Sequence, residues 1–157
     1  MDQHQFAQRL ETLRPRLFRI ALLYFSGSEA TALDVVDEAV YRGLCSLKKL
    51  RQPEFFETWM TRILINECHR EEKRRRRFRS VEELPEETAE VYDRLPLKEA
   101  LANLPPDLKE VILLRYFAGY TQEETAKALD RPRTTILSYQ RRALALLRLE
   151  LGEEGDA

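Results

Sequence analysis

One face of a helix near the C-terminus combines arginine, serine and leucine side chains, and this combination could read duplex DNA. Arginine donates paired hydrogen bonds to guanine in the major groove and neutralises phosphates, while serine can bond to several base edges. Between Asp130 and Arg148 five arginines stand against one aspartate, which makes the local net charge +4. The outward positions of this helix are Leu137, Ser138, Arg141 and Arg142.

Two helices joined by a tight turn are expected to position this face. Thr121 and Glu124 have the spacing of a capping box, which predicts a helix start, and Pro132 prevents that helix from continuing. Thr134 or Thr135 could then cap the second helix. This arrangement predicts a helix-turn-helix, with a solvated helical hairpin as the alternative. The residues expected on the inner sides are Ala126 and Leu129 in the first helix and Ile136, Tyr139, Ala143 and Leu147 in the second.

A helix near the middle of the chain joins aromatic residues to a basic run. Phe55, Phe56 and Trp59 stand at its start, and the basic run from Lys73 to Arg77 stands at its end. Aromatic rings that stack on bases and cations that follow phosphates could serve single-stranded nucleic acid. Helical spacing favours the simpler interpretation that Phe56 and Trp59 fill the core.

The charge of the 157-residue chain is divided into blocks. The net charge is -1 overall, but residues 69–79 carry +5 and residues 80–99 carry -5. Such blocks indicate separate electrostatic roles, and the acidic block predicts a flexible linker. Only 5 glycines, with abundant Leu, Glu, Arg and Ala, predict an all-α fold of two small helical domains. The predicted parts are a domain at 1–78, a linker at 79–95, a helix-turn-helix domain at 96–151 and a disordered tail at 152–157.

Two further helices carry specific expectations. Pro15 interrupts the first apolar stripe, which predicts either two helices or one helix that begins near Leu13. Asp107 and Glu110 have the spacing of a second capping box, which predicts the start of another helix. Tyr116 is expected on the inner side of that helix.

Nothing in the sequence suggests catalysis. There is no glycine-rich phosphate loop, cysteine–histidine ligand set or nucleophile–base pair, so no enzyme activity, metal, cofactor or small-molecule substrate is expected. His69 follows Cys68, but adjacent helical residues diverge by about 100° and could not share an ion. Cys45 and Cys68 occupy apolar-face positions, which predicts buried thiols in a reducing cytosol. The absence of a spanning segment and of a signal peptide predicts a cytoplasmic protein.

Four segments carry motifs in an informative order. They are the acidic helix at 32–39, the aromatic helix at 56–66, the turn at 104–107 and the segment at 114–124 that leads into the helix-turn-helix. In order and spacing they resemble the bacterial RNA polymerase sigma factors of the extracytoplasmic-function group. The resemblance covers nearly the whole chain and implies a subunit that directs core polymerase to particular promoters.

The resemblance implies roles for residues of the N-terminal domain. The acidic helix would dock on the polymerase clamp, and the loop before the aromatic helix would line a pocket for a flipped base of the minus-ten element. Asn66 would contact that base, because an amide offers both a donor and an acceptor. The implied residues are Asp34, Asp37, Glu38 and Arg42 for the clamp, Leu50, Arg51, Gln52 and Asn66 for the base, and Arg70, Lys73 and Arg74 for the strand backbone.

In the C-terminal domain, the resemblance places the outward helix face on the minus-thirty-five element and the domain itself against the polymerase flap. Arg115, Thr121 and Arg133 could touch phosphates. The chain departs from the family at Leu137 and Tyr139, where basic residues are usual. Leu137 could contact only a thymine methyl group, so an altered minus-thirty-five preference is expected. Further departures are Thr134, where the family usually has glycine, and Asp37, where it usually has glutamine.

The resemblance also implies an anti-sigma factor, often membrane-anchored, that would sequester the protein. Two other interpretations remain open. A sigma-like decoy would bind an anti-sigma factor but no promoter, which the loss of a basic residue at Leu137 favours and the retention of Asn66 disfavours. A helix-turn-helix repressor with an N-terminal dimerisation domain would leave the acidic helix and the basic run unexplained.

Overall fold

The computed structural model describes residues 1–78 and 95–152, and every regular element in these two ranges is a helix. The expected all-α fold is confirmed. Most of the predicted linker and tail lies outside the described residues, so the division of the chain into four parts stays a prediction. We call residues 1–78 the N-terminal half and residues 95–152 the C-terminal half. The helices are α1 (Gln3–Tyr24), α2 (Glu29–Cys45), α3 (Phe56–Arg77), α4 (Leu95–Asn103), α5 (Pro106–Ile112), the π-helical turn η4 (Leu113–Phe117), α6 (Gln122–Leu129) and α7 (Arg133–Leu151), with short 3-10 turns η1 (Leu47–Lys49) and η2 (Pro53–Phe55).

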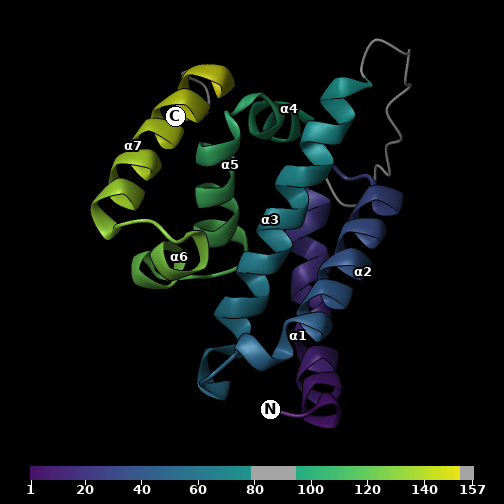
Figure 1. Ribbon diagram of the computed structural model, residues 1–157. Coiled ribbons are helices and arrows are strands. Elements are labelled where there is room, and N and C mark those ends of the chain that lie inside the picture. The colour runs from purple at the N-terminus through teal and green to yellow at the C-terminus, as the bar shows by residue number, and fades with distance from the viewer. Residues whose placement is uncertain (79–94, 153–157) are drawn as a thin grey trace.

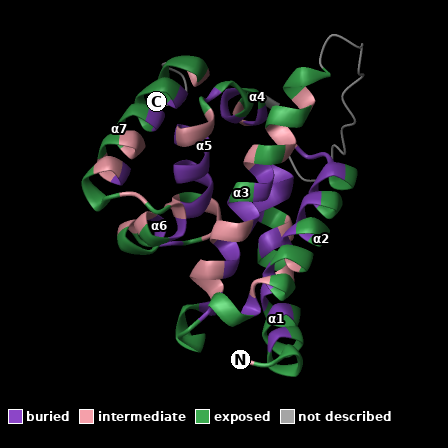
Figure 2. Ribbon diagram, viewed as in Figure 1, coloured by how far each residue is buried: buried purple, intermediate pink, exposed green. Residues whose placement is uncertain are grey.

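Helix α3 is the element on which both halves of the chain pack. Helices α1 and α2 lie along one side of it, and α5 and α6 lie on its other side (Figure 1). Met60 and Leu64 of α3 are fully buried, and buried residues gather where the helices face one another (Figure 2). Phe56 is also buried, as expected, whereas Trp59 is half-buried and Phe55 is exposed. Helix α3 therefore contributes to the core from more than one side.

The core of the N-terminal half extends into the C-terminal half. Leu113 and Leu114 from η4 are fully buried in the same apolar cluster as α1, α2 and α3, together with Tyr120 and Ala128. A second cluster lies within the C-terminal half and joins α4, α5 and α7 through residues such as Leu101. Since burial of apolar area is the main favourable term in folding, the shared cluster couples the stability of the two halves.

Helix α1 runs unbroken through Pro15 from Gln3, so both predictions for this segment were wrong. A proline inside a helix costs roughly 3 kcal/mol because it removes one hydrogen bond and crowds the preceding turn. Two features keep the first turns helical. Asp2 and Gln5 form a capping box at the start of α1, and the Phe6 side chain is buried. Pro15 itself lies on the exposed side of α1.

The approach of α2 to α3 depends on Gly43. A Cβ atom at this position would lie 2.9 Å from the Met60 sulfur and 3.5 Å from the ring of Phe6. The first of these separations is too short for a real contact, so a larger residue would force the Met60 side chain to move. The absent side chain of Gly43 lets α2 and α3 lie close together.

The start of α5 differs from the expected capping box. Its N-cap residue is Pro105, which has no side chain that can accept a hydrogen bond. Asp107 instead accepts a hydrogen bond from Arg131, and Glu110 pairs with His69. The predicted capping box is absent because both carboxylates bond to side chains distant in sequence. Tyr116 was also misplaced, since its side chain is exposed rather than inside.

The predicted helix-turn-helix is formed by α6 and α7. Thr121 and Glu124 form the expected capping box, with hydrogen bonds of 3.1 and 2.8 Å. Asp130 takes the left-handed conformation (φ 54°) and ends α6. Helix α7 begins at Arg133 after Pro132, so neither predicted threonine cap is present. The inner stripe of α7 is as expected, with Tyr139 half-buried, but α6 buries Thr125 and Ala128 more fully than Ala126 and Leu129.

Replacing Thr121 with alanine should lower the free energy of unfolding by about 1 kcal/mol, because an N-cap hydroxyl satisfies an otherwise unpaired amide of the first helical turn. Urea unfolding followed by circular dichroism would measure the change. Thr134→Ala is the matched control, since Thr134 is exposed and makes no cap, and it should change stability by less than about 0.5 kcal/mol. Equal losses in the two variants would contradict the assigned role of Thr121.

Candidate nucleic-acid interface

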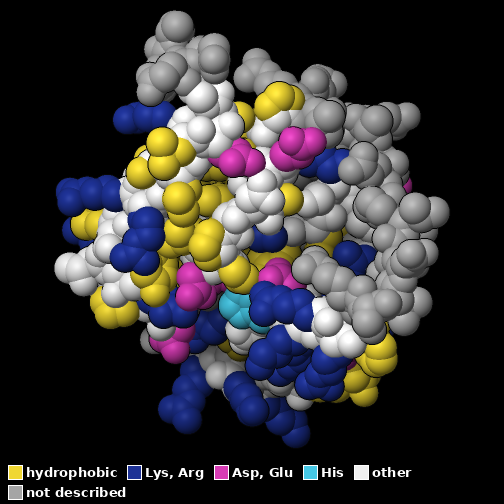
Figure 3. All heavy atoms as spheres, turned by 90° about the horizontal axis from the view of Figure 1, so that it is seen from above, with side chains coloured by type: hydrophobic (Ala, Val, Ile, Leu, Met, Phe, Trp, Pro, Cys, Tyr) yellow, Lys and Arg dark blue, Asp and Glu magenta, His cyan; other side chains and the backbone are white. Residues whose placement is uncertain are grey.

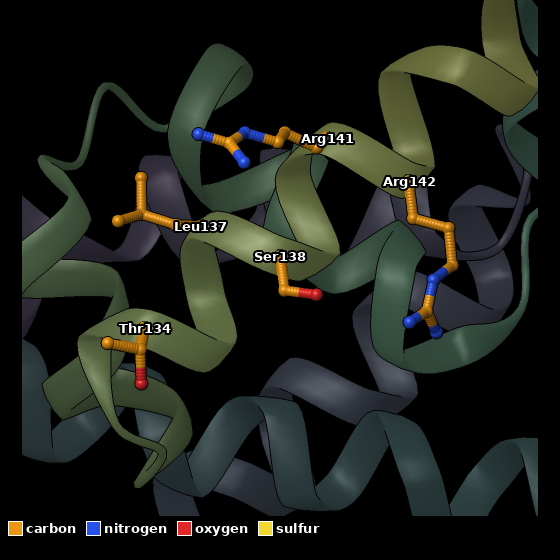
Figure 4. Close-up of a pocket in the computed structure, with 5 residues that line it drawn as sticks. All are labelled: Thr134, Leu137, Ser138, Arg141 and Arg142. Atoms are coloured by element: carbon orange, nitrogen blue, oxygen red, sulfur yellow. The ribbon is translucent and has the colours of Figure 1, made fainter.

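The outer face of α7 carries an open groove with a volume of about 500 Å³. Arg141 and Arg142 are exposed along it, and Ser138 lies between the two arginine side chains and Thr134 (Figure 4). The four residues predicted to face duplex DNA therefore lie on one surface. The lining residues are Thr134, Leu137, Ser138, Arg141 and Arg142.

Tyr139 holds part of this face in place, although the sequence predicts only an inner position for it. The guanidinium of Arg142 lies 5.9 Å from the centre of the Tyr139 ring, and that of Arg131 lies 5.5 Å from it. Such cation–π contacts contribute about 0.5–1 kcal/mol at exposed sites. Tyr139 thus replaces a usual basic residue of the family with a ring that orients two neighbouring arginines.

Of the three residues predicted to touch phosphates, Arg115 donates its hydrogen bonds to other groups of the protein. Its Nε donates to Gln140 at 3.0 Å, and its terminal nitrogen donates to the Tyr120 carbonyl at 2.6 Å. Arg115 therefore braces the turn before α6 against α7. Thr121 caps α6, and Arg133 remains exposed at the start of α7 with one long contact of 3.4 Å to Gln122.

A second pocket, of about 320 Å³, lies between the C-terminal end of α2 and the middle of α3. We call it the α2–α3 pocket. Asn66 and Arg70, both predicted to contact the minus-ten element, are exposed in it. The loop residues Leu50, Arg51 and Gln52 do not line it: Leu50 is buried in the core, and the other two are exposed elsewhere. The lining residues are Glu38, Tyr41, Arg42, Cys45, Ser46, Ile63, Asn66, Glu67 and Arg70.

Residues that the sequence did not single out supply much of this pocket. Tyr41 is 63% exposed, and its hydroxyl pKa is raised because it shares a hydrogen bond with the Cys45 thiol. Ile63 adds an apolar surface and Ser46 a hydroxyl group. Tyr41 lies three residues after Glu38 and so continues the exposed side of α2, which is the signal that could have revealed it. An aromatic ring, an apolar surface and an amide are the groups that bind an unpaired base.

Glu67 organises the polar side of the pocket. Its side chain is only 7% exposed; it forms an ion pair with Arg42 at 2.5 Å and accepts a hydrogen bond from Arg70. Arg42 contacts Glu38 as well, at 3.2 Å. A buried carboxylate is stable only when it is paired with a cation. Glu67 therefore holds the guanidinium groups of Arg42 and Arg70 beside it. Arg42 consequently faces the pocket as well as the acidic side of α2.

The remaining predicted contacts lie on two exposed surfaces. Asp34, Asp37 and Glu38 form an acidic stripe along α2, where Asp37 also pairs with Arg14 at 2.5 Å. Lys73 and Arg74 are exposed near the end of α3. Figure 3 shows how basic side chains gather beside acidic ones on one face of the molecule. Several of the α3 arginines have partners within the protein, among them Arg74 with Glu71 at 2.8 Å.

The two cysteines differ in their surroundings. Cys68 is buried, and burial raises the pKa of its thiol, whereas Cys45 is exposed, so the prediction of a second buried thiol was wrong. Cys45 stands at the last residue of α2, where the helix leaves the core. His69 pairs with Glu110 of α5 rather than with the neighbouring Cys68. Within residues 1–78 and 95–152 no group of three or more His, Cys, Asp or Glu side chains is arranged to hold a metal.

The fold and the two surfaces define an α-helical protein with a helix-turn-helix and a separate pocket between α2 and α3. The sequence matches the family Sigma-70 region 2 over residues 10–78 and the family Sigma-70, region 4 over residues 100–149. The RNA polymerase sigma factor SigV of Bacillus subtilis is 30% identical over 142 residues, which cover 87% of this chain and 85% of that protein. The ECF RNA polymerase sigma factor SigE of Mycolicibacterium smegmatis is 30% identical over 85% of this chain and 56% of that protein.

Solved structures share the fold. The sigma factor RpoE of Bartonella quintana, in complex with the anti-sigma factor NepR, superposes with a TM-score of 0.77 at 25% identity and covers 94% of this chain and 96% of its own. CnrH, in complex with the cytosolic domain of CnrY, superposes with a TM-score of 0.71 at 23% identity over 93% of this chain and 86% of its own. The chain belongs to the RNA polymerase sigma factors of the extracytoplasmic-function group. No helix among the described residues is long and apolar enough to span a membrane.

Proposed function

We propose that this chain is an alternative sigma factor, which binds core RNA polymerase and directs transcription to particular promoters. The observation that supports the proposal is the presence, in one chain, of two separate surfaces whose side chains could bind nucleic acid. The α7 face suits duplex DNA, and the α2–α3 pocket suits an unpaired base. A promoter that is recognised as a duplex and then melted requires both. The chain contributes binding specificity, and the polymerase carries out the bond chemistry.

The α7 face would read the minus-thirty-five element. Arg141 and Arg142 would donate to guanine edges or phosphates, and Ser138 would contact a base edge between them. Leu137 would pack on a thymine methyl group, so this protein would prefer a thymine where relatives with a basic residue prefer a hydrogen-bond acceptor. Arg133 would hold the phosphate backbone at the start of α7.

The α2–α3 pocket would capture a flipped base of the minus-ten element. Asn66 would read its pairing edge, and Tyr41 would stack on its face, while Arg70 would hold the adjacent phosphate. Stacking contributes about 1–3 kcal/mol per base, which offsets part of the cost of unpairing. Lys73 and Arg74 would extend the backbone contact along α3. Arg51 and Gln52 would act outside the pocket, on neighbouring nucleotides, and buried Leu50 would support their loop.

Docking on the polymerase would use the acidic stripe of α2. Asp34, Asp37 and Glu38 are exposed on one side of that helix and would meet a basic surface of the clamp, while the C-terminal half would meet the flap. Glu38 also lines the α2–α3 pocket, so docking and base capture would share an edge. An anti-sigma factor, soluble or membrane-anchored, would compete for these surfaces, since one structural relative is a complex with the anti-sigma factor NepR. The protein would act in the cytoplasm.

The two halves would have to move apart when the promoter is bound. The minus-ten and minus-thirty-five elements are separated by about 25 base pairs, or about 85 Å of duplex at 3.4 Å per base pair. A compact chain of this length has a radius of gyration of only about 15 Å. The packed arrangement of the described residues therefore cannot reach both elements at once, and it corresponds to the free or sequestered protein.

The test is reconstitution with core RNA polymerase on fragments of genomic DNA, followed by sequencing of the run-off transcripts. Discrete start sites, absent with core polymerase alone, are expected and would reveal the promoter motif. Binding to core without any start sites would favour the sigma-like decoy. A protein that ignores core and binds a palindromic duplex as a homodimer would be a helix-turn-helix repressor instead.

A further inference from the structure

The two halves of the chain meet along a polar seam on α3. The hydroxyl groups of Thr61 and Tyr120 are 2.7 Å apart and fully or nearly buried. The next residue, Arg62, donates to the Lys127 carbonyl near the end of α6. Further towards the C-terminal end of α3, the imidazole of His69 pairs with Glu110 of α5. Each of these contacts joins a residue of the N-terminal half to one of the C-terminal half.

The His69–Glu110 pair combines a buried carboxylate with an imidazole that water can reach. The Glu110 side chain is 2% exposed, and the His69 side chain is 38% exposed. A charged carboxylate at such a depth is strongly disfavoured unless a cation or a proton accompanies it. A retained proton therefore favours the closed seam, and the part-exposed imidazole lets that proton exchange with solvent.

Charged and titratable groups surround the pair on every helix packed against it. Lys109 of α5 donates to the Tyr24 carbonyl at 3.2 Å and lies 4.6 Å from the centre of the Tyr24 ring. Burial lowers the pKa of this lysine, whereas it raises the pKa values of Tyr24 and Cys68, which stay protonated. The other charged groups that act on the pair are Glu72 of α3, Asp107 of α5 and Arg131 before α7.

Closing of the seam raises the pKa of both members of the pair. The hydrogen bond to Glu110 raises the pKa of His69 above its ordinary 6.5, and burial raises the pKa of Glu110. The closed form thus binds protons more tightly than the open form does. The stabilising contribution of His69 is complete below about pH 6.5 and is lost as the pH rises through its raised pKa.

We propose that the His69–Glu110 pair is a proton-sensitive latch that holds the two halves of the chain together. Opening the latch uncovers the α3 side that carries Thr61 and Arg62, which the C-terminal half covers in the closed form. Mildly acidic conditions therefore favour the closed form, and mildly alkaline conditions favour the open one. This device goes beyond the proposed function and does not rest on it, because the opening occurs in the free protein.

The experiment measures the separation of the halves as a function of pH. Cys45 is changed to serine, and Thr12→Cys on α1 and Ala145→Cys on α7 provide two exposed labelling positions. Energy transfer between a donor and an acceptor dye then reports the ratio of closed to open protein between pH 6 and 8.5. That ratio is expected to fall about tenfold for each unit by which the seam raises the pKa of the pair.

Matched variants identify the titrating group. His69→Gln combined with Glu110→Gln removes both titrating groups of the pair but keeps hydrogen-bonding side chains, so the closed-to-open ratio of this double variant should no longer change across this pH range. His4→Gln removes the other histidine of the chain, which is exposed on α1, and should leave the pH response intact. Circular dichroism checks that each variant keeps its helices. Energy transfer that does not change with pH in the unaltered protein, or a pH response that survives in the double variant, would overturn the latch.

Discussion

Replacing Asn66 with alanine should lower run-off transcription from the protein's own promoter by roughly tenfold to a hundredfold. The exposed amide of Asn66 stands in the α2–α3 pocket, where it can donate to and accept from the pairing edge of a flipped base. A paired amide–base contact is worth about 1–3 kcal/mol of discrimination, and each 1.4 kcal/mol corresponds to a factor of ten. Without that contact, less binding free energy offsets the free-energy cost of unpairing the base.

The decisive comparison separates promoter melting from polymerase binding. Core affinity should be unchanged in Asn66→Ala, because the amide lies outside the acidic stripe of α2, and a template with the minus-ten bases already unpaired should recover part of the lost transcription. Gln8→Ala is the matched control, since it removes an exposed amide from α1, and it should transcribe normally. Full activity of Asn66→Ala would show that the flipped base is not read in the α2–α3 pocket.

Replacing Leu114 with alanine should lower the free energy of unfolding by about 2–5 kcal/mol. Leu114 is fully buried, and it belongs to η4 in the C-terminal half yet packs in the cluster built by α1, α2 and α3. Truncation would leave a cavity between the two halves as well as removing apolar contact area. For a chain of this size, the melting temperature should fall by about 5 to 15 °C.

Calorimetry and urea unfolding would measure this loss. Leu149→Ala is the matched control, because Leu149 on α7 is 78% exposed, and it should alter stability by less than about 0.5 kcal/mol. Since Leu114 joins both halves, its loss should also allow them to separate more readily at constant pH. A Leu114→Ala protein as stable as the unaltered one would mean that the shared cluster contributes little to folding.

Helical periodicity and capping chemistry, both local properties of the sequence, determine much of the fold. The capping box at Thr121 and the break at Pro132 place the helix-turn-helix correctly, because each depends on residues within one turn of one another. The same local logic places Arg141 and Arg142 on one exposed face. It fails at Pro15, where burial of Phe6 and a cap at Asp2 outweigh the local preference for a break.

The composition of the base pocket and of the seam depends on the tertiary structure. Asn66 stands out in the sequence through resemblance, but Tyr41 and Glu67 join it only through the packing of α2 against α3. Asp107 and Glu110 have the spacing of capping residues. Glu110 pairs with His69 instead because α5 packs on α3. Spacing along one helix reports which residues share a face. Spacing does not show which other helix will pack against that face, because helix packing depends on burial of the whole core.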